Sequence, residues 1–324
     1  MKSASRTLRD AGSDYHLHEN ELRIASLWRT AHIEPITELF SRMTLASEGV
    51  EGRLVISRLK RIDTIIRKLR RSDLHVKLHN MADIAGCRVI LPDMETVYKV
   101  AESLSKYPDL ENRRIKDYVS NPKEDGYRGI HFVYKIPSQA HLGRSFYAEA
   151  QIRTKSMHAW AVAVEMYGNI SGHRIKLGEG TEKERRFFKL LSCLIKEKEE
   201  RSCMDDLNSV LDEVTALEAE LNIIELLRSS YDSMFLIVSE EEKAENGYCL
   251  VSADYADQTV KIDVYDAEDA EAASKRYAEN ERNNRELQDS LLAKAPGIDA
   301  LKLALPNYFS DLSQFLELIG DIHL

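Results

Sequence analysis

The chain has 324 residues, of which 43% are apolar and 31% charged, and its formal net charge is −9. This composition supports packed cores and excludes a generally disordered chain, and the length favours two domains of ordinary size. No apolar run reaches the roughly 18 residues that a membrane span needs, and the N-terminal residues MKSASR lack the apolar stretch of a signal peptide.

The first predicted elements are helices. Apolar residues recur every three or four positions in Tyr15–Ala46, which is helical spacing. Arg53–Arg71 has a similar apolar stripe, with eight basic residues against one acidic residue, Asp63. Two interpretations of this basic run stay open: a solvated helix face, or a surface that binds a phosphate-rich ligand.

The next elements alternate between strands and helices. We predict a buried strand, an amphipathic helix, three strands and a further helix from their apolar patterns. Their bounds are Asp83–Leu91, Asp93–Tyr107, Arg113–Val119, Ile130–Ile136, Ser145–Arg153 and Thr154–Tyr167. This order predicts an α+β fold in which helices pack on a mixed β-sheet.

The rest of the chain is predicted to be a helical connector followed by a small C-terminal α/β unit. Nine acidic residues lie between Lys196 and Glu220, and we interpret them as a solvated helix face. The C-terminal unit has four predicted strands and two predicted helices: strands Phe235–Ser239, Tyr248–Tyr255, Thr259–Tyr265 and Leu301–Leu305, and helices Ala267–Ala293 and Tyr308–Ile319. The predicted domains are therefore residues 1–180, 181–230 and 231–324.

The strand Ser145–Arg153 carries the most informative pattern. Side chains on a strand alternate between its two faces, which places Glu149, Gln151 and Arg153 on one face and apolar residues on the other. The polar face lines up a carboxylate, an amide and a guanidinium. It is either an exposed sheet surface or part of a site.

Two further features favour a site that binds a nucleotide. Asp83 opens an apolar strand, where a carboxylate needs a partner or a metal, and two carboxylates, Asp83 and Glu149, suit Mg²⁺. In the loop before Ile130, Tyr127 beside Arg128 suits stacking on a nucleobase with a phosphate contact; the alternative for Tyr127 is packing. Because the sequence lacks both the Walker A and the G-x-G-x-x-G motif, basic side chains would have to hold any phosphates.

Several ordered motifs resemble the synthetase domain of the RelA/SpoT family, the (p)ppGpp synthetases. They are Arg58-Leu59-Lys60, Ile65-Ile66-Arg67-Lys68-Leu69, Asp83-Ile84-Ala85-Gly86-Cys87-Arg88, Lys116-Asp117-Tyr118, Gly126-Tyr127-Arg128-Gly129-Ile130-His131, Glu149-Ala150-Gln151-Ile152-Arg153-Thr154, His158-Ala159-Trp160-Ala161 and Glu165. The resemblance spans roughly residues 15–190 and implies that family's nucleotidyltransferase-like fold. It departs from many relatives at Gly129, where they have Ser.

The resemblance implies transfer of pyrophosphate from ATP to the 3′-hydroxyl of GDP or GTP, with Asp83 and Glu149 as catalytic carboxylates that hold Mg²⁺. The ATP-binding residues would be Arg58, Lys60, Lys68 and Arg88, and the acceptor-binding residues would be Tyr127, Lys123, Arg128, His131, Gln151 and Arg153. Asp83 and Arg88 have opposite strand parity, so we expect a bulge or a strand end near Gly86 if both face one site.

The length is that of the short, stand-alone synthetases, and the hydrolase domain's His-Asp pair is not seen. Two alternatives stay open: a toxin-type relative whose acceptor is the 3′ CCA end of tRNA, and a catalytically weak nucleotide-binding interaction module. The C-terminal unit is expected to regulate the synthetase domain or bind a partner protein. The four cysteines form no C-x-x-C pair, which argues against a zinc site and fits a reducing cytoplasm; no membrane partner is expected.

Overall fold

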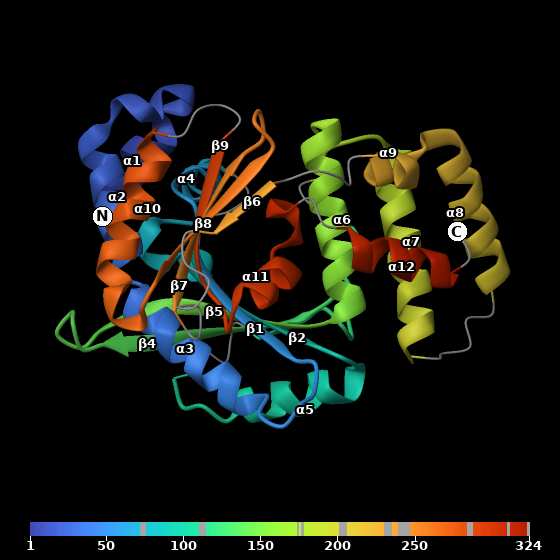
Figure 1. Ribbon diagram of the computed structural model, residues 1–324, viewed down its shortest axis with the longest axis horizontal. Helices are drawn as coiled ribbons and strands as arrows, with labels where there is room; N and C mark the ends of the chain where they lie inside the picture. Colours follow the sequence, from blue (N-terminus) through green and yellow to red (C-terminus); the bar gives the residue numbers. More distant parts are fainter. Residues whose placement is uncertain are drawn as a thin grey trace.

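The computed structural model of the protein describes residues 1–71, 76–109, 115–173, 175, 178–200, 206–229, 235–238, 247–283, 288–309 and 312–322. The strands among these residues are β1 (Leu54–Leu59), β2 (Ala85–Leu91), β3 (Lys116–Asp117), β4 (Ile130–Ser138), β5 (Arg144–Thr154), β6 (Phe235–Val238), β7 (Tyr248–Asp254), β8 (Thr259–Tyr265) and β9 (Gln288–Lys294). They form one nine-stranded sheet in the order β3-β4-β5-β2-β1-β9-β7-β8-β6 (Figure 1). Parallel pairing of β2 with β5 and antiparallel pairing of β4 with β5 make it a mixed sheet. The predicted α+β class is confirmed.

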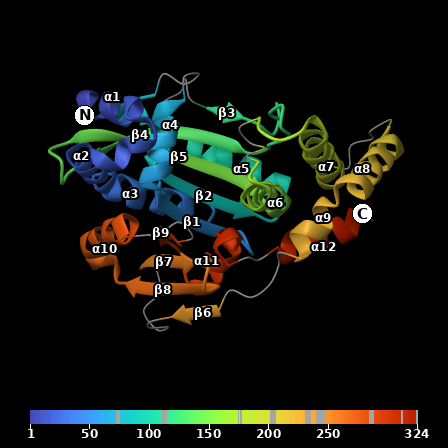
Figure 2. The same ribbon diagram turned by 90° about the horizontal axis from the view of Figure 1, so that it is seen from above.

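Helices lie on the sheet and beside it (Figures 1 and 2). The α-helices are α1 (Lys2–Asp10), α2 (Glu19–Thr30), α3 (Ile33–Ala46), α4 (Ile62–Arg70), α5 (Met94–Ser105), α6 (Lys155–Ser171), α7 (Glu182–Glu200), α8 (Leu207–Leu221), α9 (Ile223–Ser229), α10 (Ala270–Asn283), α11 (Ile298–Ala304) and α12 (Ser313–Ile322). The shorter 3-10 turns are η1 (Gly12–Leu17), η2 (Leu78–Asn80), η3 (Ala82–Ile84), η6 (Ala267–Asp269) and η7 (Pro306–Tyr308). No helix of the described residues is long and apolar enough to cross a membrane.

Most predicted elements between residues 83 and 167 are confirmed. The helices Asp93–Tyr107 and Thr154–Tyr167 appear as α5 and α6, and the strands Ile130–Ile136 and Ser145–Arg153 as β4 and β5. Asp93 and Thr154 cap α5 and α6, because each side chain accepts a backbone N–H of the first turn. The beginning of the predicted strand Arg113–Val119 lies outside the described residues.

Three predicted elements were wrong in part or whole. Helix Arg53–Arg71 begins as β1, whose β-branched residues are buried in the sheet, and only α4 is helical. Helix Ala267–Ala293 ends with α10, and its last residues form β9. Leu301–Leu305 is no strand: Leu301, Ala304 and Leu305 are buried at helical spacing around α11. The helical spacing predicted over Tyr15–Ala46 is confirmed, and this stretch forms η1, α2 and α3.

The C-terminal strands continue the N-terminal sheet. Strand β9 pairs antiparallel with β1 through Ser57↔Lys294 and Arg58↔Ala293, and with β7 along its whole length. Figure 2 shows β9, β7, β8 and β6 beside β1, with α10 and α11 against them. The predicted domain boundaries at 180 and 230 stay predictions; the structure adds that the strands after residue 230 share a sheet with those before it.

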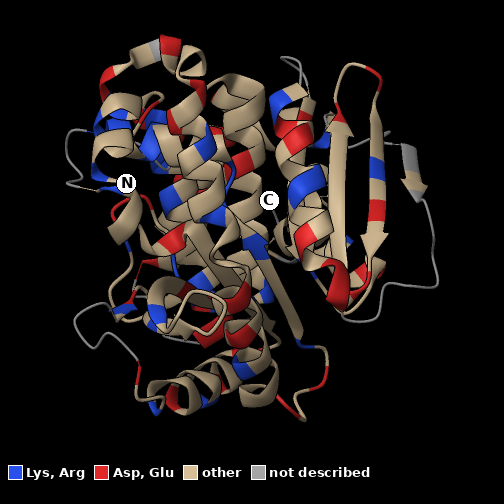
Figure 3. Cartoon of the chain, turned by 90° about the vertical axis from the view of Figure 1, so that its left-hand side faces the viewer, with Lys and Arg blue, Asp and Glu red and all other residues tan. Residues whose placement is uncertain are grey.

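The described residues between 181 and 229 contain the helices α7, α8 and α9, which pack with α6 and α12 beside the sheet (Figure 2). Their shared core contains Trp160, Phe187, Phe188 and Phe315, each at most 2% exposed. On the side of the molecule in Figure 3, basic and acidic residues are interspersed.

His32, between α2 and α3, predicts a loss of stability in acid. Its ring is buried against Trp28 and Phe146, and burial lowers its pKa from 6.5 to about 4. A depressed histidine pKa stabilises the fold above the unfolded value and loses that contribution as the pH falls toward the folded value. Between pH 7 and pH 4 we expect a loss of roughly 3 kcal/mol from this group.

Urea denaturation at pH 7 and at pH 4 measures this loss. His32→Phe should shrink the difference between the two pH values by that amount, because phenylalanine keeps the aromatic contacts and takes up no proton. His16→Gln is the control, since His16 is exposed, and should keep the wild-type difference. An unchanged difference in His32→Phe would contradict the assignment.

Candidate active site

The central strands place polar side chains side by side on one face of the sheet. Arg88 of β2 lies opposite Gln151 of β5, which in turn lies opposite His131 of β4. Two pairs further along these strands, Gly86 lies opposite Glu149. The alternation predicted for β5 is confirmed, because its even positions from 146 to 152 are buried and Glu149 and Gln151 are half-buried.

Asp83 lies in the turn η3, just before β2 begins. Strand alternation therefore does not apply to it, and the predicted strand end lets Asp83 and Arg88 approach one site. Its Oδ2 is 2.9 Å from Lys60 Nζ and its Oδ1 is 2.8 Å from Lys68 Nζ. Burial alone would raise the pKa of Asp83, but the two ammonium groups hold it well below the usual range. Asp83 is a carboxylate at neutral pH.

Glu149 is the second carboxylate of the site. Its Oε1 is 3.2 Å from His131 Nδ1, and its Oε2 accepts a 2.8 Å hydrogen bond from Gln151 Nε2. Burial favours the protonated acid and so does the nearby charge of Asp83, but the contacts with His131 and Gln151 together lower the Glu149 pKa. Burial also lowers the pKa of His131. The site thus holds an ionised Glu149 beside a neutral imidazole.

Cationic groups converge next to the two carboxylates. The Arg88 guanidinium lies 3.3 Å from Gln151 Oε1, through both Nε and Nη2. Burial lowers the pKa of Arg88, and the like charges of Arg153 and Arg58 add to this effect. Lys60, which contacts Asp83, has its pKa lowered by burial in the same way. Positive groups held this close together form a site for a polyanion such as a chain of phosphates.

Tyr127 is more enclosed than a stacking role suggests. Its ring is 6% exposed and lies 4.8 Å from both the Lys123 ammonium and the Arg153 guanidinium carbon. Its hydroxyl accepts a 2.7 Å hydrogen bond from Arg153 and lies 2.5 Å from His131 Nε2. A base would stack on this ring only after Lys123 or Arg153 moved. Stacking stays a prediction, and the contacts seen are those of the packing alternative.

Arg128 faces helix α7 instead of Asp83 and Glu149. Its side chain is 3% exposed, Nη1 donates a 2.8 Å hydrogen bond to Glu199 Oε2, and Nη2 pairs with Glu200. Sequence reasoning missed both glutamates and assigned their acidic run to a solvated helix face. A pairing between a loop and a helix end about 70 residues later leaves no periodic signal that could have revealed it.

C-terminal acidic side chains contact the basic segment around β1 and α4. Asp289 of β9 pairs with Arg61. Glu281 of α10 accepts a 3.1 Å hydrogen bond from the Ile62 N–H at the beginning of α4, and its other oxygen lies 2.5 Å from the buried Arg29. The C-terminal unit therefore satisfies part of the basic run. The predicted ATP-binding role of Arg58, Lys60 and Lys68 stays a prediction.

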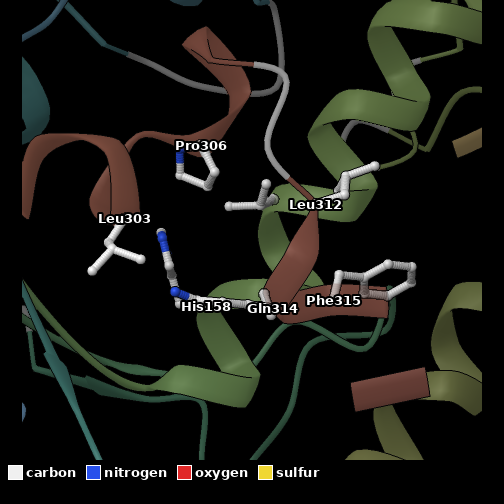
Figure 4. A pocket seen from close by; sticks show the side chains of 8 residues that line it. His158, Leu303, Pro306, Leu312, Gln314 and Phe315 are labelled. Carbon is white, nitrogen blue, oxygen red and sulfur yellow. The ribbon is translucent and has the colours of Figure 1, made fainter. Parts of the chain in front are cut away.

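Two cavities of the described part of the chain are lined by residues other than the predicted site residues. A cavity of about 10 Å³ lies where α11 and α12 pack on α6, with His158 at its wall (Figure 4); it has room for about one water. The other, of about 560 Å³, lies between Arg53, Lys155 and Glu317. The candidate site is therefore defined by its converging charges.

Comparison with known proteins finds similarity in the part of the chain that carries these charges. Residues 57–167 match a family model described as the region found in RelA / SpoT proteins. The chain is 36% identical over 111 residues to GTP pyrophosphokinase YwaC of Bacillus subtilis (32% of this chain, 52% of the relative). It is 34% identical over 109 residues to GTP pyrophosphokinase YjbM of the same organism (33% and 52%). The chain spans about half the length of these curated relatives.

A solved structure is also similar: small alarmone synthetase 1 of Bacillus subtilis, bound to its product pppGpp. It is 27% identical, with a TM-score of 0.44, and the match covers 54% of this chain and 90% of that one. The matched region 57–167 contains Asp83, Glu149 and the cations around them. Residues 57–167 are therefore similar to the region found in RelA / SpoT proteins, as the motifs of the sequence predict.

Proposed function

We propose that the chain is an ATP-dependent pyrophosphokinase that transfers pyrophosphate from ATP to the 3′-hydroxyl of GDP or GTP. The 3′-oxygen attacks the β-phosphorus of ATP, the bond between the α- and β-phosphoryl groups breaks, and AMP leaves. The observation that carries the proposal is the ionised pair Asp83 and Glu149 among the converging cations. The naming of both curated relatives as GTP pyrophosphokinases supports it.

In this reaction Glu149 accepts the proton of the 3′-hydroxyl, and the neutral His131 beside it holds the carboxylate in place. The basic residues at the site neutralise the phosphates of ATP, as phosphoryl transfer requires. The donor set is Arg58, Lys60, Lys68 and Arg88, and the acceptor set is Tyr127, Lys123, His131, Gln151 and Arg153, with Arg128 behind them.

Mg²⁺ fits the donor chemistry of this site. Among the described residues no three His, Cys, Asp or Glu side chains gather as a metal cage. Mg²⁺ is usually bound by one or two carboxylates together with substrate phosphates, and Asp83 and Glu149 are two ionised carboxylates beside the expected phosphate site. Bound there, Mg²⁺ would neutralise charge on the transferred group.

One incubation tests the proposal. ATP labelled in its β,γ-phosphates is supplied with Mg²⁺ and with GDP, GTP or tRNA, and the products are separated. Label on a guanosine nucleotide is the expected result. Label on tRNA alone would favour the toxin-type alternative, for which the exposed Arg67, Arg70 and Arg71 offer a basic surface. If no acceptor is labelled, the proposed enzymatic activity is overturned, and the nucleotide-binding module is the alternative that remains.

We also propose that the C-terminal unit restrains the synthetase site on the donor side. Asp289 pairs with Arg61, and Glu281 occupies the N-terminus of α4, two positive features beside Arg58 and Lys60. Carboxylates there compete with the phosphates of ATP for the same positive groups. Because the contact lies within one chain, its effective concentration is high, and a weak contact suffices to restrain the site.

Asp289→Asn is expected to raise activity at low ATP about two- to fivefold, because a partly exposed ion pair contributes roughly 0.5–1 kcal/mol. The point variant is a more specific test than deletion of residues 231–324, because deletion would expose the edge of β1 that β9 covers. The control is Asp299→Asn, whose side chain is 98% exposed. Equal activity in the two variants would remove the restraint from the proposal.

A further inference from the structure

We propose that the C-terminal end of α7 positions the acceptor side of the site, and that Arg128 acts through this helix and not as a ligand of the acceptor. The inference rests on the proposed pyrophosphate transfer. Helix α7 begins at Glu182, beyond the matched family region 57–167. We therefore assign a role in the reaction to a helix that the family match does not reach.

The first observation is that both terminal nitrogens of Arg128 pair with α7. Its two terminal nitrogens bind Glu199 and Glu200, and 3% of its side chain is exposed. Breaking a buried ion pair leaves an uncompensated charge, so Arg128 would have to lose both partners before it could reach a phosphate. These surroundings are those of a residue that holds its loop against α7.

The second observation is that the same helix holds both chain segments at one end of the β4–β5 pair. Glu199 also accepts a hydrogen bond from the Thr154 hydroxyl, and Thr154 caps α6 by accepting the Met157 N–H at 3.1 Å. One carboxylate thus joins Arg128, which precedes β4, to Thr154, which ends β5. Because the two strands are antiparallel, these residues lie at the same end of the pair, and His131 and Glu149 follow a few residues further along it.

The third observation is the close approach of α7 to Gly126. The Ser192 hydroxyl donates a 2.6 Å hydrogen bond to the Gly126 carbonyl oxygen. A Cβ atom at Gly126 would lie 3.1 Å from Lys189 Cα, and the Gly126 φ of +91° favours glycine as well. The backbone of the loop is therefore pressed against the helix, immediately before Tyr127.

These contacts lead by short steps to the reacting carboxylate. Tyr127 follows Gly126 and precedes Arg128, and its hydroxyl lies 2.5 Å from His131 Nε2. His131 Nδ1 lies 3.2 Å from Glu149. If α7 released the loop, Tyr127 would shift and the acceptor contacts would shift with it, whereas Lys60 and Lys68 on the donor side would stay with Asp83.

The test compares the Michaelis constants for acceptor and donor in three variants: Glu199→Gln with Glu200→Gln, Arg128→Gln, and all three changes together. We expect the double variant and Arg128→Gln each to raise the acceptor KM about tenfold and to leave the ATP KM within twofold. The triple variant should be no worse than either, because residues that act as one unit are not additive. The control is Glu213→Gln on α8, which breaks an exposed ion pair with Arg186 of α7.

A multiplicative loss in the triple variant would overturn the inference and make Arg128 a ligand. An equal rise in both KM values would also overturn it. Should the double variant fail to fold, Glu200→Gln alone keeps the Glu199 contacts and should raise only the acceptor KM, by a smaller factor. If the wild-type protein transfers no pyrophosphate, the proposed function is overturned instead. Amide hydrogen exchange then decides the inference. Compared with wild type, the double glutamate variant should exchange faster across residues 123–131 and at the same rate across β7.

Discussion

Glu149→Gln is expected to reduce pyrophosphate transfer at least ~10²-fold in a protein that remains folded, which is the usual contribution of a general base. Glutamine has nearly the same shape and can still accept the Gln151 hydrogen bond that Glu149 accepts now. It has no negative charge for Mg²⁺ and no basicity for the 3′-hydroxyl proton. Single-turnover transfer from labelled ATP measures the loss, and a thermal melt of the same sample verifies the fold.

Two further variants make this result interpretable. Glu102→Gln removes a carboxylate from an exposed helical ion pair with Lys106 and should leave transfer unchanged. Asp83→Asn should also abolish transfer, but it leaves Lys60 and Lys68 without their shared carboxylate and so costs stability as well. Glu149 is the cleaner test. Activity within a few-fold of wild type in Glu149→Gln would remove that residue from the mechanism.

Local sequence pattern was sufficient to predict the central part of the site. The alternation along β5 placed Glu149 and Gln151 on one face, and the conflict in parity between Asp83 and Arg88 predicted a bulge or a strand end near Gly86, of which η3 provides the second. Both are properties of a short stretch of backbone, so they can be read without knowledge of the rest of the chain. The family motifs added the roles of these residues, which the structure itself does not test.

The errors lie where long-range pairing decides the structure. Residues 288–294 continue a helical pattern in the sequence, but they form β9 because β1 and β7 lie on either side of them. In the sequence, Glu199 resembles any acidic residue on a helix surface, and Arg128 resembles any basic residue in a loop. Their ion pair is seen only in the folded structure. A single sequence carries no local signal of such contacts.

Glu281→Gln is expected to cost about 3–5 kcal/mol of folding free energy, because it removes the charge that compensates a buried guanidinium. Arg29 is fully buried, its carboxylate partner is Glu281 at 2.5 Å, and the Tyr277 ring covers it at 4.2 Å. The other Glu281 oxygen accepts the Ile62 N–H. The contact joins α2 and α4 to α10, so its loss should loosen the C-terminal unit from the rest of the chain. Urea denaturation measures the change in stability.

The reference for this variant is Glu225→Gln, which breaks an exposed pair with Arg228 and should cost less than about 0.5 kcal/mol. Replacing both buried partners, as Arg29→Met with Glu281→Leu, should recover most of the stability, since an apolar pair leaves no unpaired charge behind. A loss below about 1 kcal/mol in Glu281→Gln would mean that solvent reaches Arg29 and that the pair is a surface contact. Failure of the double variant to recover, after a large loss in the single one, would instead assign the stability to the hydrogen bond that Glu281 accepts from Ile62 at the beginning of α4.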